Sequence, residues 1–154
     1  MKVSLEKQMD LRYGLGEEEK VLPVLRDYLQ RNDIVRNPDT MGPYDFYRDI
    51  DDNTIETWEL KSRKYPSTEQ KIQEGVMVGT NKLHYATHLL FNFTDALYIY
   101  TIREHELASF RQDKGFTRQR AGGCATNPVT FIPFTRLKLI HKWPRRCLIT
   151  LDDL

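Results

Sequence analysis

The sequence is poor in cysteine, with only Cys124 and Cys147 among its 154 residues. The two residues stand far apart, without CxxC spacing and without histidines at a distance that suggests a shared ligand set. The pattern therefore indicates neither a disulfide framework nor a zinc site. We expect both cysteines to be free structural thiols.

Long hydrophobic runs are also lacking. No segment approaches the roughly 20 consecutive apolar residues that a helix needs to cross a bilayer. The first residues, MKVSLEKQMDLRYGL, contain neither a long apolar core nor a small-residue cleavage site of the kind found in secretory signals. We therefore expect a soluble, intracellular protein with no membrane partner.

Glycine and proline are few, at eight and seven residues, whereas aromatic residues are plentiful, with two Trp, eight Tyr and seven Phe. Together with a hydrophobic content of 40%, this composition offers enough apolar surface to offset the chain entropy lost on folding. The length suits one hydrophobic core. We expect a single globular domain over residues 1–154.

Charge is distributed unevenly, although the net charge is only +1. Residues 33–60 carry eight acids against two arginines, and residues 61–154 carry fifteen bases against eight acids. An acidic pocket within a basic surface suits a protein that holds a divalent cation together with a polyanion. Ordinary scatter of charges would give the same numbers, so the pattern is only a weak indication.

Hydrophobic periodicity predicts the N-terminal elements. Apolar residues at helical spacing behind three consecutive glutamates predict a helix over residues 17–31, with a kink or a later start at Pro23. Alternation and turn residues predict strands over 33–36, 44–49 and 54–63, with a turn at 51–53.

Further along the chain, Ser67 and Gln70 resemble a capping box that opens a short helix over 68–74. Residues 75–86 fit a strand or turn that leads into a helical piece. The remaining predicted elements are strands 88–93, 96–102 and 129–134, helices 104–111 and 135–143, and an exposed loop 112–128. This order predicts an α/β fold with a mixed central sheet flanked by helices.

Three charged residues within the predicted hairpin carry the main functional hypothesis. Because side chains alternate along a strand, Glu59 and Lys61 point to one face, and Trp58 and Leu60 point to the other. Two carboxylates on adjacent strands, such as Asp45 and Glu59, suit Mg²⁺ or Mn²⁺ bound at a phosphodiester. An ammonium on the same face would stabilise charge or orient the attacking water. A surface Glu-x-Lys with no such role is common, so the motif alone is weak.

The first helix offers a third acid. Glu18 shares the face of Val21, Leu22 and Leu25, and an acid on a buried helix face is costly unless it is paired or ligates a metal. Glu17 is the competitor, because it stands on the side of Val21, Val24 and Tyr28. Favourable electrostatics at a helix start remain the alternative for either glutamate.

The order of a helix acid, an aspartate in the second strand and Glu59-Leu60-Lys61 in the third resembles the PD-(D/E)XK nuclease superfamily, which has the restriction-endonuclease-like fold. The string ELKSRKYPS followed by VGTNKL is similar to small viral and phage members. The resemblance covers about residues 17–100. In one departure, Tyr44 precedes Asp45 and Pro43 lies one place further back, so the literal Pro-Asp pair is missing.

The resemblance implies an αβββαβ core and metal-dependent cleavage of nucleic acid. It also implies the role of each residue. Asp45 and Glu59 would bind the metal, the Leu60 carbonyl would complete its shell, and Glu18 would bind it directly or through water. Lys61 would assist the attacking water.

Basic residues outside the motif are candidates for contacts to nucleic-acid phosphates. They are Arg63, Lys64, Lys82, Arg118 and Arg120, with Arg111 and Lys114 in the same loop as the last two. Solvated surface is the alternative for each of them. Tyr65 is a candidate for base stacking or simply a packing residue, and His84 and His88 are either a ligand pair or ordinary partly buried histidines.

The sequence therefore predicts a metal-dependent nuclease, an endonuclease or exonuclease that acts on DNA rather than RNA. The chain leaves little room for a recognition domain, so specificity would come from a homodimer or from selectivity for a nucleic-acid structure such as a junction or flap. The rival from another class is a protein that binds nucleic acid without cutting, or an assembly protein, on the same fold.

Overall fold

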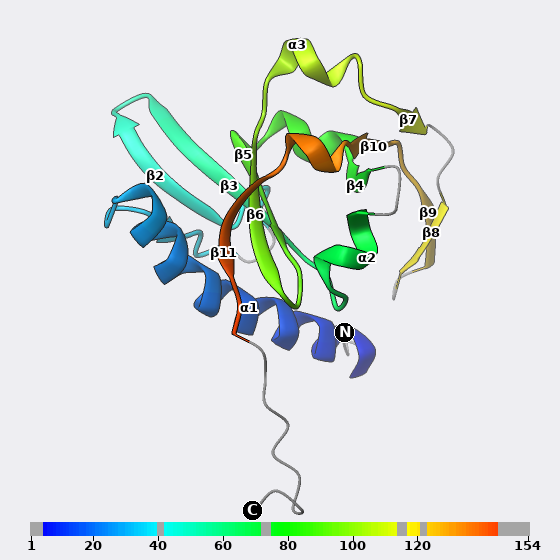
Figure 1. The fold of residues 1–154 in the computed structure, drawn as a ribbon, viewed down its shortest axis with the longest axis horizontal. Coiled ribbons are helices and arrows are strands. Elements are labelled where there is room, and N and C mark those ends of the chain that lie inside the picture. The colour runs from blue at the N-terminus through cyan, green and yellow to red at the C-terminus, as the bar shows by residue number, and fades with distance from the viewer. Residues whose placement is uncertain (1–4, 40–41, 72–74, 114–116, 121–122, 145–154) are drawn as a thin grey trace, which may run out of the picture.

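The computed structural model describes residues 5–39, 42–71, 75–113, 117–120 and 123–144 (Figure 1). Within these ranges the helices are α1 (Leu5–Leu29), α2 (Ser67–Lys71) and α3 (Glu104–Leu107), with 3-10 turns η1 (Thr80–His84) and η2 (Phe134–Arg136). The strands are β1 (Val35–Arg36), β2 (Phe46–Asp51), β3 (Thr54–Ser62), β4 (Val76–Gly79), β5 (His88–Asn92), β6 (Ala96–Thr101), β7 (Gln112–Asp113), β8 (Thr117–Arg120), β9 (Gly123–Thr126), β10 (Val129–Ile132) and β11 (Lys138–Lys142).

The largest sheet of the described chain has six strands in the order β1-β2-β3-β5-β6-β11. Strand β3 runs parallel to β5, and the other neighbours are antiparallel. A second sheet has the order β4-β10-β7, and β8 pairs with β9 as a separate hairpin. The molecule is therefore a mixed α/β protein, as the order of elements predicts.

Helix α1 covers one face of the large sheet (Figure 1). Val21 and Leu25 are fully buried there, at the helical spacing that the sequence shows, against Phe46, Trp58 and Leu90. Burial of these apolar side chains contributes most of the stability of the helix, since helices in proteins depend on packing more than on intrinsic helix propensity. The helix face that points to the sheet is thereby fixed.

The opposite face of the large sheet is covered by β4, β10 and the short helices (Figure 1). Leu89 and Phe91 of β5 are buried against Val76, Val78 and Ile132 of the second sheet. Burial on both faces explains why β5 and β6 read as nearly continuous apolar runs.

Among the residues the structure describes, no helix is both long and apolar enough to span a bilayer.

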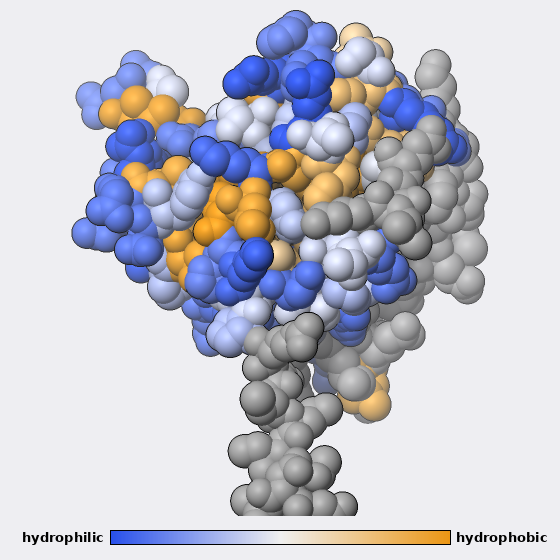
Figure 2. All heavy atoms as spheres, in the orientation of Figure 1, coloured by the Kyte–Doolittle hydropathy of each residue, from blue (hydrophilic) through white to orange (hydrophobic). Residues whose placement is uncertain are grey.

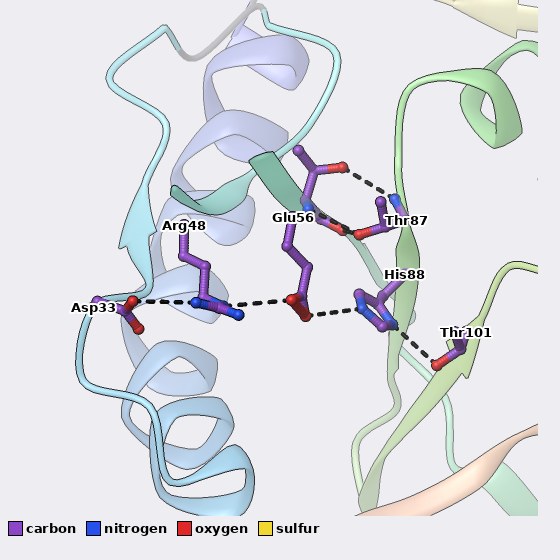
Figure 3. A network of polar contacts seen from close by, with 7 residues as sticks. Asp33, Arg48, Glu56, Thr87, His88 and Thr101 are labelled. Atoms are coloured by element: carbon purple, nitrogen blue, oxygen red, sulfur yellow. Dashed lines mark hydrogen bonds and ion pairs between the residues drawn. The ribbon is translucent and has the colours of Figure 1, made fainter. Parts of the chain in front are cut away.

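A row of polar side chains crosses the large sheet on the α1 side (Figure 3). Arg48 contacts Asp33 and Glu56 at 3.4 Å each, and His88 approaches Glu56 at 3.1 Å and Thr101 at 3.0 Å. Burial lowers the pKa of His88, although Glu56 opposes that shift. His88 thus lies in a strand within a local network.

The other histidine of the suggested pair is placed differently. His84 is exposed at the end of η1, outside the strand that holds His88. The two histidines therefore do not form a pair on one helix face.

The apolar surface in Figure 2 includes a patch near the tip of the β2–β3 hairpin. Ile50 and Ile55 are 52% and 39% exposed there. Isolated exposed apolar side chains are ordinary for a folded protein, so this small patch needs no separate explanation.

The predicted C-terminal helix over 135–143 is wrong. These residues form the end of η2 and strand β11, which pairs with β6 and shows a register shift between Leu139 and His141. Ile140 and Trp143 pack against the α1-side cluster. The open edge of β6 offers backbone partners that a helix would forgo, so tertiary pairing overrides the local pattern.

Other boundaries also differ from the prediction. The first helix begins at Leu5 rather than at residue 17 and continues through Pro23, and the helix predicted over 104–111 is the single turn α3. The predicted loop 112–128 contains the short strands β7, β8 and β9. Short strands in a polar, glycine-containing segment leave no apolar alternation to detect.

The predicted capping box at Ser67 is wrong. The backbone N–H and the hydroxyl of Ser67 both donate to the Asp95 carboxylate at 2.7 Å, and the Gln70 amide donates to the Gly75 carbonyl. A residue 28 positions away therefore accepts the hydrogen bond from the first N–H of α2. A capping box is a local pattern, so the sequence around Ser67 does not reveal this partner.

Replacing Asp95 with alanine is expected to lower the free energy of unfolding by about 1.5–3 kcal/mol, the usual range for hydrogen bonds to a charged group. Chemical denaturation followed by circular dichroism would measure the change. Asp52 lies exposed in the β2–β3 turn, and its alanine variant is the control. Equal stability of the two variants would contradict the capping role.

Candidate functional site

Asp45 lies where β2 separates from β3. Its backbone N–H donates to the Trp58 carbonyl at 2.9 Å, and its carboxylate accepts the Leu60 N–H at 2.7 Å. The pairing of β2 with β3 ends at Phe46 and Trp58. The Leu60 N–H therefore donates to the Asp45 side chain and not to a backbone carbonyl of β2. The carboxylate is thereby held at an open edge, and the Leu60 carbonyl points to the same side, since N–H and C=O of one strand residue share an edge.

Glu18 reaches this point from α1. Its carboxylate accepts a hydrogen bond from Arg36 at 2.8 Å and lies against Asp45. Burial raises the pKa of Glu18 to about 7, assisted by the hydrogen bond and the charge of Asp45, whereas Arg36 acts in the opposite direction. Two carboxyl groups that share a site hold one proton more readily than ordinary carboxyls do.

Glu17 belongs to a different cluster. Its carboxylate accepts a hydrogen bond from Asn92 and lies 3.5 Å from Lys20. Asn92 in turn accepts a hydrogen bond from the Trp143 indole at 2.7 Å. The structure thus places Glu18, and not its competitor Glu17, beside Asp45.

Glu59 and Lys61 point away from α1, as strand alternation predicts. The Lys61 ammonium lies 3.3 Å from the Glu59 carboxylate, and Lys82 of η1 lies 3.7 Å from the same oxygen. Burial and the charge of Asp45 raise the pKa of Glu59, although both lysines oppose that shift. Burial lowers the pKa of Lys61, against the attraction of Glu59. Glu59 is therefore close to Asp45, and Glu59 and Lys61 are both poorly solvated.

Hard oxygen donors at this edge suit Mg²⁺ or Mn²⁺. The donors are the Glu18 and Asp45 carboxylates and the Leu60 carbonyl. A cation there would oppose the burial and the charge of Asp45, which raise the Glu18 pKa. Glu59 would join them by turning its carboxylate from Lys61 and Lys82. Among the described residues, no three His, Cys, Asp or Glu side chains stand grouped for a metal in this arrangement.

Several residues predicted to contact phosphates also have partners within the protein. Arg63 donates to the Met77 carbonyl at 3.1 Å and so ties β3 to β4. Lys82 belongs to the Glu59 cluster, and Lys64 lies with its ammonium 4.8 Å from the Tyr13 ring centre. Arg111 lies over the Phe131 ring at 4.6 Å.

The remaining candidates give less information. Tyr65 donates to Gln70 at 2.8 Å and packs on Phe93, so its hydroxyl and its ring both have partners within the protein. Lys114 and Cys147 lie outside the described residues, as do the side chains of three residues on the β8–β9 hairpin, Arg118, Arg120 and Cys124.

Lys82 is the cluster member whose place the sequence does not predict. It lies in the segment 75–86, which has no clear periodicity and forms β4 followed by η1. Tyr13, which contacts Lys64, was not predicted to take part either, because it precedes the expected start of the first helix. The local sequence does not reveal contacts of this kind, because the contacting residues are far apart along the chain.

The Glu18 carboxyl predicts a pH dependence in metal-free solution. Its folded pKa, about 7, exceeds the ordinary value of 4.5, so the folded state holds more protons between these pH values. The stabilisation is full below about pH 4.5 and is lost as the pH rises to about 7. We expect a loss of about 1–2 kcal/mol, since solvent screening reduces the roughly 1.4 kcal/mol per pKa unit.

Denaturation in chelator at pH 5, 6 and 7, with wild type and Glu18→Gln, would measure this contribution. The variant should lose the part of the pH dependence that wild type shows in this window. A control, Glu104→Gln, changes an exposed acid of α3 and should behave as wild type. Parallel curves for wild type and Glu18→Gln would contradict the shifted pKa.

Searches of protein-family models, of curated proteins and of solved structures each find no significant match to this chain.

Proposed function

We propose that this chain is a divalent-metal-dependent nuclease of the PD-(D/E)XK superfamily, and that it hydrolyses phosphodiester bonds in DNA rather than RNA. The observation that carries the proposal is the meeting of residues from separate elements. Glu18 of α1 lies beside Asp45, and the charge of Asp45 also acts on Glu59, which is paired with Lys61. These are the residues and the order that the sequence motif requires.

Each side chain has a role that follows from its place. Asp45 is held by the Leu60 N–H, and because each carboxylate oxygen accepts at more than one position, the carboxylate keeps lone pairs for a ligand. Glu18 and the Leu60 carbonyl would hold the same Mg²⁺ or Mn²⁺. The metal, when bound, would polarise the phosphate and lower the pKa of a coordinated water.

Lys61 would act on the attacking water. Its ammonium is held by Glu59 on the side of the cluster that faces away from α1, and burial has lowered its pKa. As the water oxygen bonds to phosphorus and the bond from phosphorus to the sugar oxygen breaks, the water releases one proton to solvent and the departing sugar oxygen takes up one proton from solvent. Lys61 would orient the water and stabilise the charge that develops on the phosphate.

One observation favours a second function, nucleic-acid binding without cleavage. Lys61 and Lys82 both approach one oxygen of Glu59, so this carboxylate is compensated by protein cations. A protein that keeps Glu59 paired in this way would bind a polyanion at the lysines without needing a metal.

The test is cleavage of fluorescent single-stranded DNA, duplex DNA, a branched junction and RNA by wild type and Asp45→Ala, with Mg²⁺, with Mn²⁺ and with chelator. We expect metal-dependent cutting of a DNA substrate that disappears in the variant. Cutting that persists in chelator or in Asp45→Ala would contradict the proposal. Binding to these substrates without cutting in any metal would favour the second function.

A further inference from the structure

A recess of about 490 Å³ lies between α1 and the end of β3. Its walls include Tyr13, Gly14 and Glu18 of α1, Leu60 of β3, and Lys64 just beyond the strand. Glu18 and Leu60 belong to the candidate site as well, since Asp45 binds the Leu60 N–H and lies against Glu18. Any group in this recess therefore lies next to the position at which a phosphodiester would be cut.

The walls combine the chemistry that nucleotides require. The ring of Tyr13 and the side chain of Leu60 offer apolar surface for a base, and the Lys64 ammonium, 4.8 Å from the Tyr13 ring centre, brings a positive charge to the same place. Aromatic rings and cations together are what proteins use to hold single strands, because every base has a face that stacks. The recess thus suits a base and its phosphate together.

Gly14 contributes by its lack of a side chain. It lies inside α1, where glycine is unfavourable relative to alanine. A Cβ added there would meet no atom within 4 Å, so packing does not require glycine at this position. The missing side chain instead leaves the wall of the recess open.

Tyr13 borders another recess as well. A second recess, of about 580 Å³, shares Tyr13 and is lined also by Lys20 and Trp143, with the Lys20 ammonium 4.1 Å from the indole centre. This is again an aromatic ring with a cation beside it. Tyr13 of α1 lines both recesses, so each has an aromatic ring and a cation in its walls.

We propose that the recess at Gly14 binds the base of an unpaired nucleotide adjacent to the cut phosphate, so that the substrate is single-stranded at that position. This inference rests on the proposed function. A base within a duplex is stacked and paired, and it would enter a recess walled by α1 and β3 only after flipping out of the helix. Single strands, or the unpaired arms of branched DNA, enter without that cost.

The matched pair Gly14→Leu and Gly16→Leu tests the proposal. Gly16 also has no atom within 4 Å of an added Cβ, it is exposed, and it does not line the recess. Both changes place a good helix former in α1, so both variants should fold. Gly14→Leu alone should fill the recess.

Binding of a labelled oligothymidine and of a duplex of equal length would be measured by fluorescence anisotropy, with Ca²⁺ in place of Mg²⁺ to prevent cleavage. Wild type should bind the single strand more tightly than the duplex. Gly14→Leu should weaken single-strand binding at least tenfold, and Gly16→Leu should stay within twofold of wild type. Tyr13→Ser, which removes the ring without adding bulk, should also weaken single-strand binding.

Failure of this inference differs from failure of the proposed function. If wild type cuts DNA but Gly14→Leu binds and cuts single strands as wild type does, the recess is not a nucleotide site and the nuclease proposal stands. Equal or tighter binding of the duplex by wild type would overturn the inference in the same way. If wild type neither binds nor cuts any substrate, both proposals are wrong.

Discussion

Replacing Lys61 with methionine is expected to slow phosphodiester cleavage by about a hundred- to a thousandfold, the range for loss of one donor that stabilises charge in the transition state. Nucleic-acid binding should persist, because the carboxylates, Lys82 and the recess along α1 remain. Single-turnover cleavage at saturating enzyme would measure the rate, and anisotropy in Ca²⁺ would measure binding.

The fold should survive this change. Burial lowers the pKa of Lys61, which means that the ammonium is held at a desolvation cost that methionine does not incur. Lys82 remains 3.7 Å from the Glu59 carboxylate, so Glu59 keeps a cationic partner after the substitution. Loss of activity in Lys61→Met would therefore report the chemistry and not unfolding.

Lys138→Met is the matched control. Lys138 is exposed on β11, at the opposite end of the sheet order from β1, and its ammonium lies over the Tyr28 ring. Removing this lysine should leave the cleavage rate within about twofold of wild type, since surface charges contribute little. Unchanged cleavage in Lys61→Met would refute the role given to Lys61. An equal loss of cleavage rate in both variants would mean that Lys61 acts only through the overall positive charge of the protein.

The sequence predicts those features of the fold and of the candidate site that strong local periodicity determines. The β2–β3 hairpin alternates clearly, so the common face of Glu59 and Lys61 follows from the sequence alone. The buried face of α1 follows from Val21, Leu22 and Leu25 in the same way.

Features that depend on distant partners are not predictable from local patterns. Asp95 satisfies the start of α2 from 28 residues away, and Lys82 reaches Glu59 from a 3-10 turn. Strand β11 forms because β6 presents an edge, although its sequence also fits a helix. Each of these depends on tertiary neighbours, which override weak local preferences.

Replacing Trp58 with alanine is expected to lower the free energy of unfolding by about 3–5 kcal/mol. Trp58 is fully buried between α1 and the sheet and stacks on His88, with ring centres 5.2 Å apart. A typical domain is stable by only about 5–15 kcal/mol, so this loss is a large share of the total. Denaturation by urea, followed by circular dichroism, would measure it.

Trp58→Phe should cost much less, below about 1.5 kcal/mol. The buried indole N–H has no hydrogen-bond partner among the residues the structure describes, and burial of such a donor costs about 1–3 kcal/mol. Phenylalanine removes this donor and keeps an aromatic ring in the core. Tyr85 is 59% exposed, and Tyr85→Ala should change stability by less than about 0.5 kcal/mol.

Trp58 also connects the core to the candidate site. Its carbonyl accepts the Asp45 N–H at 2.9 Å, and Glu59 and Leu60 follow it directly in β3. The proposed metal site predicts that Mn²⁺ raises the melting temperature of wild type. Because the contacts of Trp58 to the site use the backbone, Trp58→Phe should retain that rise, whereas Trp58→Ala should lose part of it. If phenylalanine costs as much stability as alanine, the indole N–H is satisfied in solution and the core depends on the full tryptophan.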